Sequence, residues 1–398
     1  MVSTTRRLSL DDALGAHLAE RETRALRRHL RPIASGIGPR VMIDGRSVLQ
    51  FCSNDYLGLA NHPAVTGAAA EALAQYGTGA GAARLVVGTS SPHVALEDAI
   101  AQLKRTEAAV VLASGYHANT GVLPALTGPE DIIFSDALNH ASIIDGCRLS
   151  QARVEVYHHA DAAHLESLLA TAHSARRRIV VTESVFAMDG DLAPLRDLVA
   201  VAQRYEASLV VDEAHATGIF GSSGGGLVEA LELGDAIDVQ VGTLSKAIGA
   251  LGGYVAGSQE LIDTIVNDAR PFVYTTALPP SIAAAAHAAI KLITQEPDRR
   301  VRLWSHAAFL RSQLSQAGFQ VSPGKSPILP VIIGAAATAV EMSDALLDSG
   351  VLVPAIRPPT VPTGTARLRV TPMATHTDAD LAAAVDAFIA AGQATRQL

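Results

Sequence analysis

The strongest constraint on the fold is a series of short, continuously apolar segments that alternates with helical patterns between residues 109 and 256. The apolar segments are rich in Val and Ile, which is typical of strands that are buried on both faces. Helices that connect successive strands predict an α/β fold with a mostly parallel central sheet. The predicted strands are residues 109–112, 132–134, 154–157, 179–182, 209–211, 239–242 and 254–256.

The alternation stops near residues 268–276, and a pair of prolines follows. Beyond them, an alanine-rich helical segment leads into helices and strands in mixed order, among them a short strand over residues 351–355, which predicts a smaller C-terminal α+β domain. A chain of 398 residues is long enough for one large and one small domain. The predicted parts are an N-terminal arm over residues 1–50 with a helix from Ser9 to about His29, a large domain over 51–278 and a small domain over 279–398.

Charge and cysteine content narrow the expected partners and location. The net charge is −8 and the chain has no long basic run, which argues against nucleic acid as a partner. No apolar run is long enough to span a bilayer, so we expect no membrane association. The two cysteines, Cys52 and Cys147, are far apart and form neither a disulfide framework nor a metal-binding pattern. We therefore expect a cytoplasmic protein without a metal site.

Polar residues follow the predicted strands, and ligands of open parallel sheets bind beyond the carboxyl ends of the strands. Gly115 and Tyr116 begin a helix after the first strand, where backbone N–H groups can receive a phosphate and the Tyr116 ring can pack flat on a ligand. Later strands are followed by His140, by residues 183–189, by Asp212 with His215, and by Thr243, Ser245 and Lys246. Because parallel strands end at one edge of a sheet, these residues predict a single site.

Lys246 lies among hydroxyls and glycines with few charges near it in sequence. Partial desolvation lowers a lysine pKa and frees the amine for Schiff-base chemistry. A pyridoxal phosphate (PLP) site needs such a lysine, a carboxylate for the ring nitrogen, an aromatic neighbour and donors for the phosphate. Lys246, Asp212, His140 and His215 supply these groups together with the helix start at Gly115, so the ordered set indicates a PLP enzyme.

Three other kinds of site fit these residues less well. A Ser-His-Asp hydrolase that uses Asp212 and His215 lacks a G-x-S-x-G segment, and the two residues are too close in sequence for that relay. A non-catalytic nucleotide-binding module leaves Lys246 unexplained. A metal site on the histidines at 158, 159 and 164 lacks an acidic cluster nearby in sequence.

The motifs at residues 53–59, 76–79, 183–191, 212–215 and 243–246 together resemble the α-oxoamine synthases, which are PLP-dependent transferases of fold type I. The resemblance spans nearly the whole chain. It implies an acyltransferase that condenses an amino acid with an acyl thioester and releases CO2. It also implies a homodimer with active sites at the subunit interface.

One branch of this family is indicated by two C-terminal segments, residues 356–362 and 364–369. They are most similar to the branch that joins L-alanine to a pimeloyl group, carried on CoA or on acyl carrier protein (ACP), in biotin biosynthesis. Serine palmitoyltransferase and 2-amino-3-ketobutyrate CoA ligase are the alternatives within the family.

The resemblance also implies roles for individual residues. Lys246 binds the cofactor and acts as the base, Asp212 supports the ring, and His140 stacks on the ring and contacts the amino acid. The other implied cofactor contacts are Gly115, Tyr116, His215, Thr243, Ser245 and Thr275, the last toward the partner subunit's phosphate. The implied substrate contacts are Arg28, Asn54, Arg357 and Thr360, with Arg357 meeting a carboxylate. Ala187 departs from the family, which often has Ser near the phenolic oxygen of the cofactor.

Overall fold

A seven-stranded sheet forms the centre of the computed structural model, which describes residues 9–398. The strand order is β3-β9-β8-β7-β6-β4-β5, and only β9 runs antiparallel to its neighbours. The predicted α/β class and mostly parallel sheet are therefore confirmed. The strands are β3 (Ala108–Leu112), β4 (Ile132–Asp136), β5 (Arg153–Tyr157), β6 (Arg178–Glu183), β7 (Ser208–Asp212), β8 (Val239–Thr243) and β9 (Gly253–Gly257).

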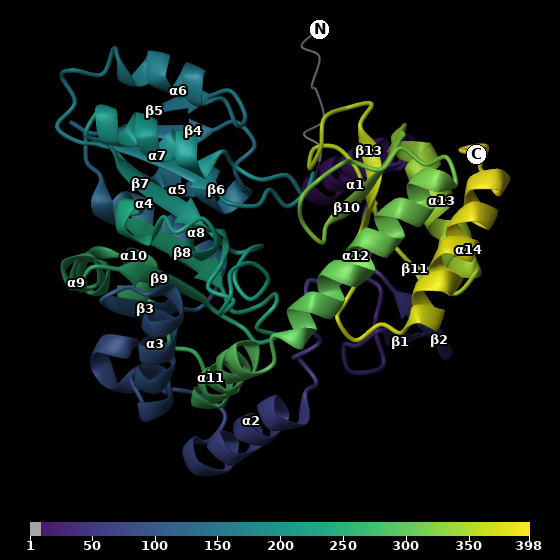
Figure 1. Ribbon diagram of the computed structural model, residues 1–398, viewed down its shortest axis with the longest axis horizontal. Helices are drawn as coiled ribbons and strands as arrows, with labels where there is room; N and C mark the ends of the chain where they lie inside the picture. Colours follow the sequence, from purple (N-terminus) through teal and green to yellow (C-terminus); the bar gives the residue numbers. More distant parts are fainter. Residues whose placement is uncertain (1–8) are drawn as a thin grey trace, which may run out of the picture.

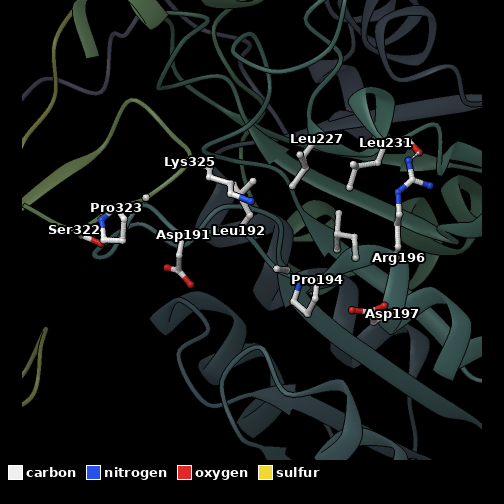
Figure 2. A pocket seen from close by; sticks show the side chains of 13 residues that line it. Asp191, Leu192, Pro194, Arg196, Asp197, Leu227, Leu231, Ser322, Pro323 and Lys325 are labelled. Carbon is white, nitrogen blue, oxygen red and sulfur yellow. Dashed lines mark hydrogen bonds between the residues drawn. The ribbon is translucent and has the colours of Figure 1, made fainter. Parts of the chain in front are cut away.

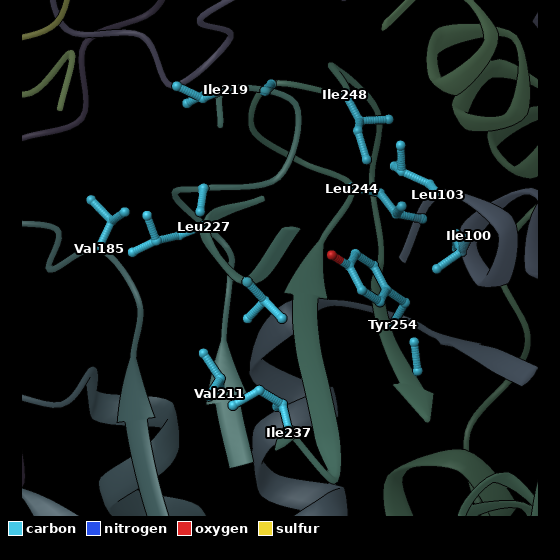
Figure 3. Close-up of a cluster of buried hydrophobic side chains, with 14 of the residues drawn as sticks. Ile100, Leu103, Val185, Val211, Ile219, Leu227, Ile237, Leu244, Ile248 and Tyr254 are labelled. Atoms are coloured by element: carbon cyan, nitrogen blue, oxygen red, sulfur yellow. The ribbon is translucent and has the colours of Figure 1, made fainter. Parts of the chain in front are cut away.

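The sheet is buried on both faces because alternate residues of each strand enter opposite cores. In β7, Leu209 and Val211 belong to one core, whereas Val210 belongs to the other. Figure 3 shows part of the first core, where Tyr254 of β9 lies near Leu244 and Ile100.

Helices cover both faces of the sheet. Those with residues in the core that contains Val210 are α4 (Gly115–Leu126), α5 (Ala141–Leu149), α9 (Gln259–Asp268) and α10 (Arg270–Val273). Those with residues in the opposite core are α2 (Pro63–Tyr76), α3 (Ser91–Lys104), α6 (Ala162–Leu169), α7 (Leu195–Arg204), α8 (Leu227–Ala230), α11 (Pro280–Gln295) and the first part of α12 (Asp298–Gln316). Helix α11 begins beyond the predicted end of the large domain but packs into its core.

The rest of the chain forms a second body, and the long helix α12 (Asp298–Gln316) joins the two (Figure 1). Its own core contains residues from α12, α13 (Ala336–Asp348) and α14 (Asp378–Ala394). One sheet has the order β10-β13-β12, from β10 (Leu329–Gly334), β13 (Ala366–Val370) and β12 (Ala355–Ile356). Another has the order β1-β2-β11, from β1 (Arg40–Ile43), β2 (Arg46–Gln50) and β11 (Val351–Leu352). The N-terminal arm thus pairs with the C-terminal part of the chain, and the domain limits stay a prediction, with residues 1–8 of the arm outside the described range.

Two local predictions were wrong. Helix α1 (Leu10–Thr23) ends before His29, because Arg357 donates hydrogen bonds to the carbonyls of Ala25 and Arg27 and so holds this segment out of the helix. The predicted strand over residues 351–355 is divided between two sheets, since β11 pairs with β2 and β12 pairs with β13. Pro354 lies between the two short strands and cannot donate to a ladder.

Within residues 9–398, no helix is both long and apolar enough to cross a membrane. The same residues contain two cysteines, and neither forms a disulfide.

A buried ion pair ties the carboxyl end of β7 to the glycine-rich loop that precedes α8. Lys104 Nζ lies 2.5 Å from Glu213 Oε2, and both side chains are inaccessible to solvent. Glu213 Oε1 accepts from the backbone N–H groups of Leu227 and Val228, at 2.7 and 3.0 Å. Lys104 also donates to the carbonyl of Gly225. Glu213 therefore has bonding partners for both carboxylate oxygens, although no solvent reaches it.

We expect Lys104→Met to destabilise the fold by about 3–5 kcal/mol, because it leaves the Glu213 charge buried without its cation. Urea unfolding measures the loss. Arg105→Gln is the matched control, since the Arg105 side chain is 67% exposed and an ion pair with a solvated cation contributes about 1 kcal/mol or less. Its partner Glu229 keeps hydrogen bonds from residues 222, 223 and 225 in this variant. Equal losses in the two variants would contradict this account of the buried pair.

Candidate active site

Lys246 follows β8 and is half-buried. Burial lowers the pKa of its amine to about 8, and the positive charge of Arg369 acts in the same direction. Asp212 and Glu183 oppose this shift. Close to the lysine in sequence, the hydroxyl oxygens of Thr243 and Ser245 are 2.7 Å apart. A sizeable fraction of the amine is therefore uncharged near neutral pH, as a nucleophile or base requires.

Asp212 ends β7 and is buried. Its Oδ2 accepts from Asn119 Nδ2 at 2.7 Å, and its Oδ1 accepts from the Ala214 N–H at 2.8 Å. Asn119 belongs to α4, and its Nδ2 also donates to Ser142 Oγ at 3.0 Å. The carboxylate is thus fixed in place by donors from two elements.

His140 and His215 are both held in the uncharged form. His140 caps α5, and its Nδ1 lies 2.8 Å from Ser142 Oγ. Burial and the nearby Lys246 lower the pKa of His140. Burial lowers the pKa of His215 well below its usual value, and Lys246 and Arg369 add to the effect. His215 Nδ1 lies 2.8 Å from the Tyr56 hydroxyl.

The N-terminus of α4 lies against β8. An added Cβ on Gly115 would come within 3.1 Å of Thr243 Cβ, so glycine allows this close approach. The cap is Ser114, whose Oγ accepts from the His117 N–H at 3.2 Å. The Tyr116 ring is exposed and its hydroxyl donates to Asp145, so it is not enclosed within the group around Lys246.

Arg369 was given no role by the sequence, yet the structure places it in this group. It lies on β13 in the second body and is buried. Its guanidinium donates to Ala187 O at 2.6 Å, to Asn54 Oδ1 at 3.1 Å and to the Tyr56 hydroxyl at 3.2 Å. All three acceptors are uncharged, and Arg369 forms no ion pair within residues 9–398. The available signal was a pair of arginines, Arg367 and Arg369, on a short strand that is otherwise apolar.

Three of the predicted substrate contacts lie together at the N-terminal arm. Arg28 donates to Thr360 Oγ1 at 3.2 Å. Arg357 binds backbone carbonyls of the arm, as described above, so its guanidinium is engaged with the chain itself. Beside this segment is a cavity of about 660 Å³, whose lining includes Arg21, Arg24, Leu138, Asn139 and residues 358–363. Asn139 places one end of this cavity next to His140.

Thr275 and the histidines at 158, 159 and 164 have other surroundings. Thr275 lines a small recess with Arg84 and Phe272, and its predicted contact with a partner subunit stays a prediction. His159 lies between Asp136 and Asp191, at 2.9 and 2.8 Å. Burial disfavours the charged ring, but the hydrogen bonds to the two carboxylates override it and raise the pKa of His159 to about 10. His159 therefore forms an ion bridge between Asp136 at the end of β4 and Asp191 in the loop after β6.

A second cavity, of about 520 Å³, lies between residues 191–197 and the loop over 322–325 (Figure 2). The charges of its lining residues cancel, because Asp191 and Asp197 are negative and Arg196 and Lys325 are positive. None of the predicted site residues lines it, so the chemistry lies with the group around Lys246.

The residues in this group fit PLP, the cofactor that the sequence implies. An amine with a lowered pKa, a fixed carboxylate, uncharged histidines and a helix N-terminus meet at one edge of the sheet. Two buried polar atoms in the same region, Asn119 Oδ1 and Ser184 Oγ, have no hydrogen-bond partner among the described residues. Such atoms are expected where a polar ligand completes the site.

Comparisons with known proteins agree with this chemistry. Residues 46–388 match the family model "Aminotransferase class I and II". The chain is 51% identical to 8-amino-7-oxononanoate synthase of Anaeromyxobacter dehalogenans, covering 96% of this chain and 94% of that protein. It is 49% identical to the synthase of the same name from Geobacter sulfurreducens, covering 96% and 98%. A serine palmitoyltransferase from S. paucimobilis, solved with bound PLP–myriocin, superposes with a TM-score of 0.94 at 33% identity and covers 98% of this chain and all of that one.

Proposed function

We infer the function from the family: the chain belongs to the class I and II aminotransferases and, within them, to the 8-amino-7-oxononanoate synthases. It is a PLP-dependent acyltransferase that acts on an amino acid and an acyl thioester. The proposed substrates are L-alanine and pimeloyl-CoA or pimeloyl-ACP, and the products are 8-amino-7-oxononanoate, CO2 and the free carrier, as a step of biotin biosynthesis. The observation that carries this proposal is the identity of about half of all residues with these synthases over nearly the whole chain.

The proposed residue roles combine the geometry of the site with the resemblance to the family. Bound PLP supplies an electron sink for the bonds at Cα of the amino acid. Lys246 holds the cofactor and removes the Cα proton, a role that its lowered pKa suits. Asp212 holds a proton at the ring nitrogen, and His140 lies against the ring. The remaining proposed cofactor contacts are His215, Thr243, Ser245, the α4 N-terminus at Gly115 and Tyr116, and Thr275 of the partner subunit.

Arg369 is the proposed partner of the amino-acid carboxylate. It is buried, lies near Lys246 and has only uncharged acceptors. A guanidinium suits a carboxylate because it offers two parallel donors. Asn54, which accepts from Arg369, contributes to the same region. The cavity beside the arm is the proposed route for the acyl thioester. Thr360 lines this cavity, and Arg28 and Arg357 hold the arm against the segment that contains Thr360.

A homodimer and a cytoplasmic location complete the proposal. Leu85, Val86 and Val87 are exposed by 55%, 73% and 74%, a large apolar area for a monomer surface. Helix α1 has no buried residue either, so we propose that a second copy of the chain packs against α1 and against residues 85–87. The free cysteines agree with a reducing compartment.

The function is tested by measuring CoA release with alanine, glycine and serine, each combined with pimeloyl-CoA and with longer acyl-CoAs. We expect alanine with pimeloyl-CoA to give the highest kcat/KM, and a change of amino-acid side chain to lower it about 10-fold or more. Lys246→Ala serves as the inactive control. A preference for serine with a long acyl chain would instead favour the serine palmitoyltransferase reaction, the second candidate that the structural similarity supports.

Replacing Arg369 tests the proposed carboxylate contact. We expect Arg369→Lys to raise the KM for alanine and to lower kcat/KM about 10- to 150-fold, as expected for loss of a charge-assisted hydrogen bond of about 1.5–3 kcal/mol. The KM for the acyl thioester should change little. Arg367→Lys is the matched control on the same strand, because Arg367 pairs with Asp189 instead. If both variants show the same KM for alanine, Arg369 does not bind the carboxylate.

A further inference from the structure

Glu183 is a buried acid beside the active site for which neither the sequence nor the proposed mechanism has a use. It ends β6, and Asp212 ends the neighbouring parallel strand β7. The two are register partners, so their side chains leave adjacent strands at the same level. Glu183 is 4% exposed and Asp212 is 6% exposed. Two carboxyl groups therefore meet in a region that solvent hardly reaches.

The surroundings of the two acids differ. Asp212 accepts hydrogen bonds from an amide and a backbone N–H, as described above, and both favour its charged form. Glu183 forms no ion pair within residues 9–398. Its position is fixed through its own backbone N–H, which donates to Asn139 Oδ1 at 3.1 Å. Neighbouring carboxylates in a low dielectric do not both ionise, and the one with more hydrogen-bond donors keeps the charge.

We propose that Glu183 is a positioning residue for the reaction: the Glu183–Asp212 pair carries one proton, which Glu183 holds so that the single negative charge stays on Asp212. The negative charge of Asp212 then lies beside the proposed position of the ring nitrogen of the cofactor. A second negative charge would also attract a proton to the amine of Lys246, which must be free to act as the base. Glu183 thus acts through Asp212 and Lys246, and this role rests on the proposed function.

The electrostatic environment supports this assignment. Burial and the charge of Asp212 raise the pKa of Glu183 to about 8, and Asp136 adds to the shift. Lys246 and the backbone of His140 act in the opposite direction but do not restore the usual value. Arg369, His215 and His140 are the other titratable groups near Lys246.

The pH dependence of thermal unfolding tests the proton on Glu183 without relying on turnover. An acid whose pKa is raised to about 8 on folding binds its proton more tightly in the folded state. Its contribution to stability is present below its unfolded pKa of about 4.3 and is lost as the pH rises toward 8. Glu183→Gln removes this ionisation and keeps the shape of the protonated acid. We expect the unfolding midpoint of the wild-type holoenzyme to fall relative to that of the variant between about pH 5 and pH 8.

Other groups titrate in both proteins and cancel in this difference. Lys246 is bonded to the cofactor in both holoenzymes, so it does not contribute to the difference between them. Glu155→Gln is the matched control, because Glu155 lies on the edge strand β5, pairs with Arg153 and is partly exposed. It should follow the wild-type pH dependence. A constant difference between wild type and Glu183→Gln across this range would overturn the proposal.

Asp212→Asn provides a second test should the Gln variant fail to fold. It removes the neighbouring negative charge and leaves Glu183 in place, so Glu183 should ionise at lower pH. We expect the wild-type decline in unfolding midpoint to end at a lower pH in this variant. An unchanged end point would show that Asp212 does not keep Glu183 protonated. Both readouts are independent of substrate, so their failure is distinguishable from failure of the proposed reaction.

Discussion

The site depends on several charged groups being buried together at one edge of a parallel sheet. The strands β4, β6, β7 and β8 end at this edge and bring His140, Glu183, Asp212 and Lys246 close to one another. Burial disfavours every charge there, and the groups respond to each other: Lys246 loses proton affinity while Glu183 gains it. The reactive protonation states therefore come from the whole group, not from any one residue.

The second body of the molecule completes this group. Arg369 reaches from β13 to the Ala187 carbonyl, and Arg367 of the same strand pairs with Asp189. Ser326 Oγ donates to Gly190 O at 2.7 Å, so another segment of that body holds the same loop. The loop over residues 184–191 is thus the junction between the two bodies. Because Arg369 both binds this loop and lies near Lys246, docking of the second body and formation of the candidate site are linked.

Much of this arrangement was predictable from local patterns. Buried strands are continuous apolar runs, and polar residues directly after them mark the ligand edge, so Lys246, Asp212 and His140 were found. The partners of Arg369 are more than 180 residues away in sequence, and no local pattern specifies them. The early end of α1 has the same cause, since the Arg357 side chain acts across the fold. Glu183 was visible as a strand-end residue, but its pairing with Asp212 required the strand register.

The central claim is that Lys246 alone, of the four lysines in the chain, bonds covalently to PLP. The direct measurement is borohydride reduction of the protein with PLP, followed by proteolysis and mass spectrometry of the labelled peptides. We predict that the phosphopyridoxyl group is found on Lys246 and that the Lys246→Ala variant yields no reducible adduct. A label on Lys104, Lys291 or Lys325 instead, or an adduct that persists in the variant, would contradict the account.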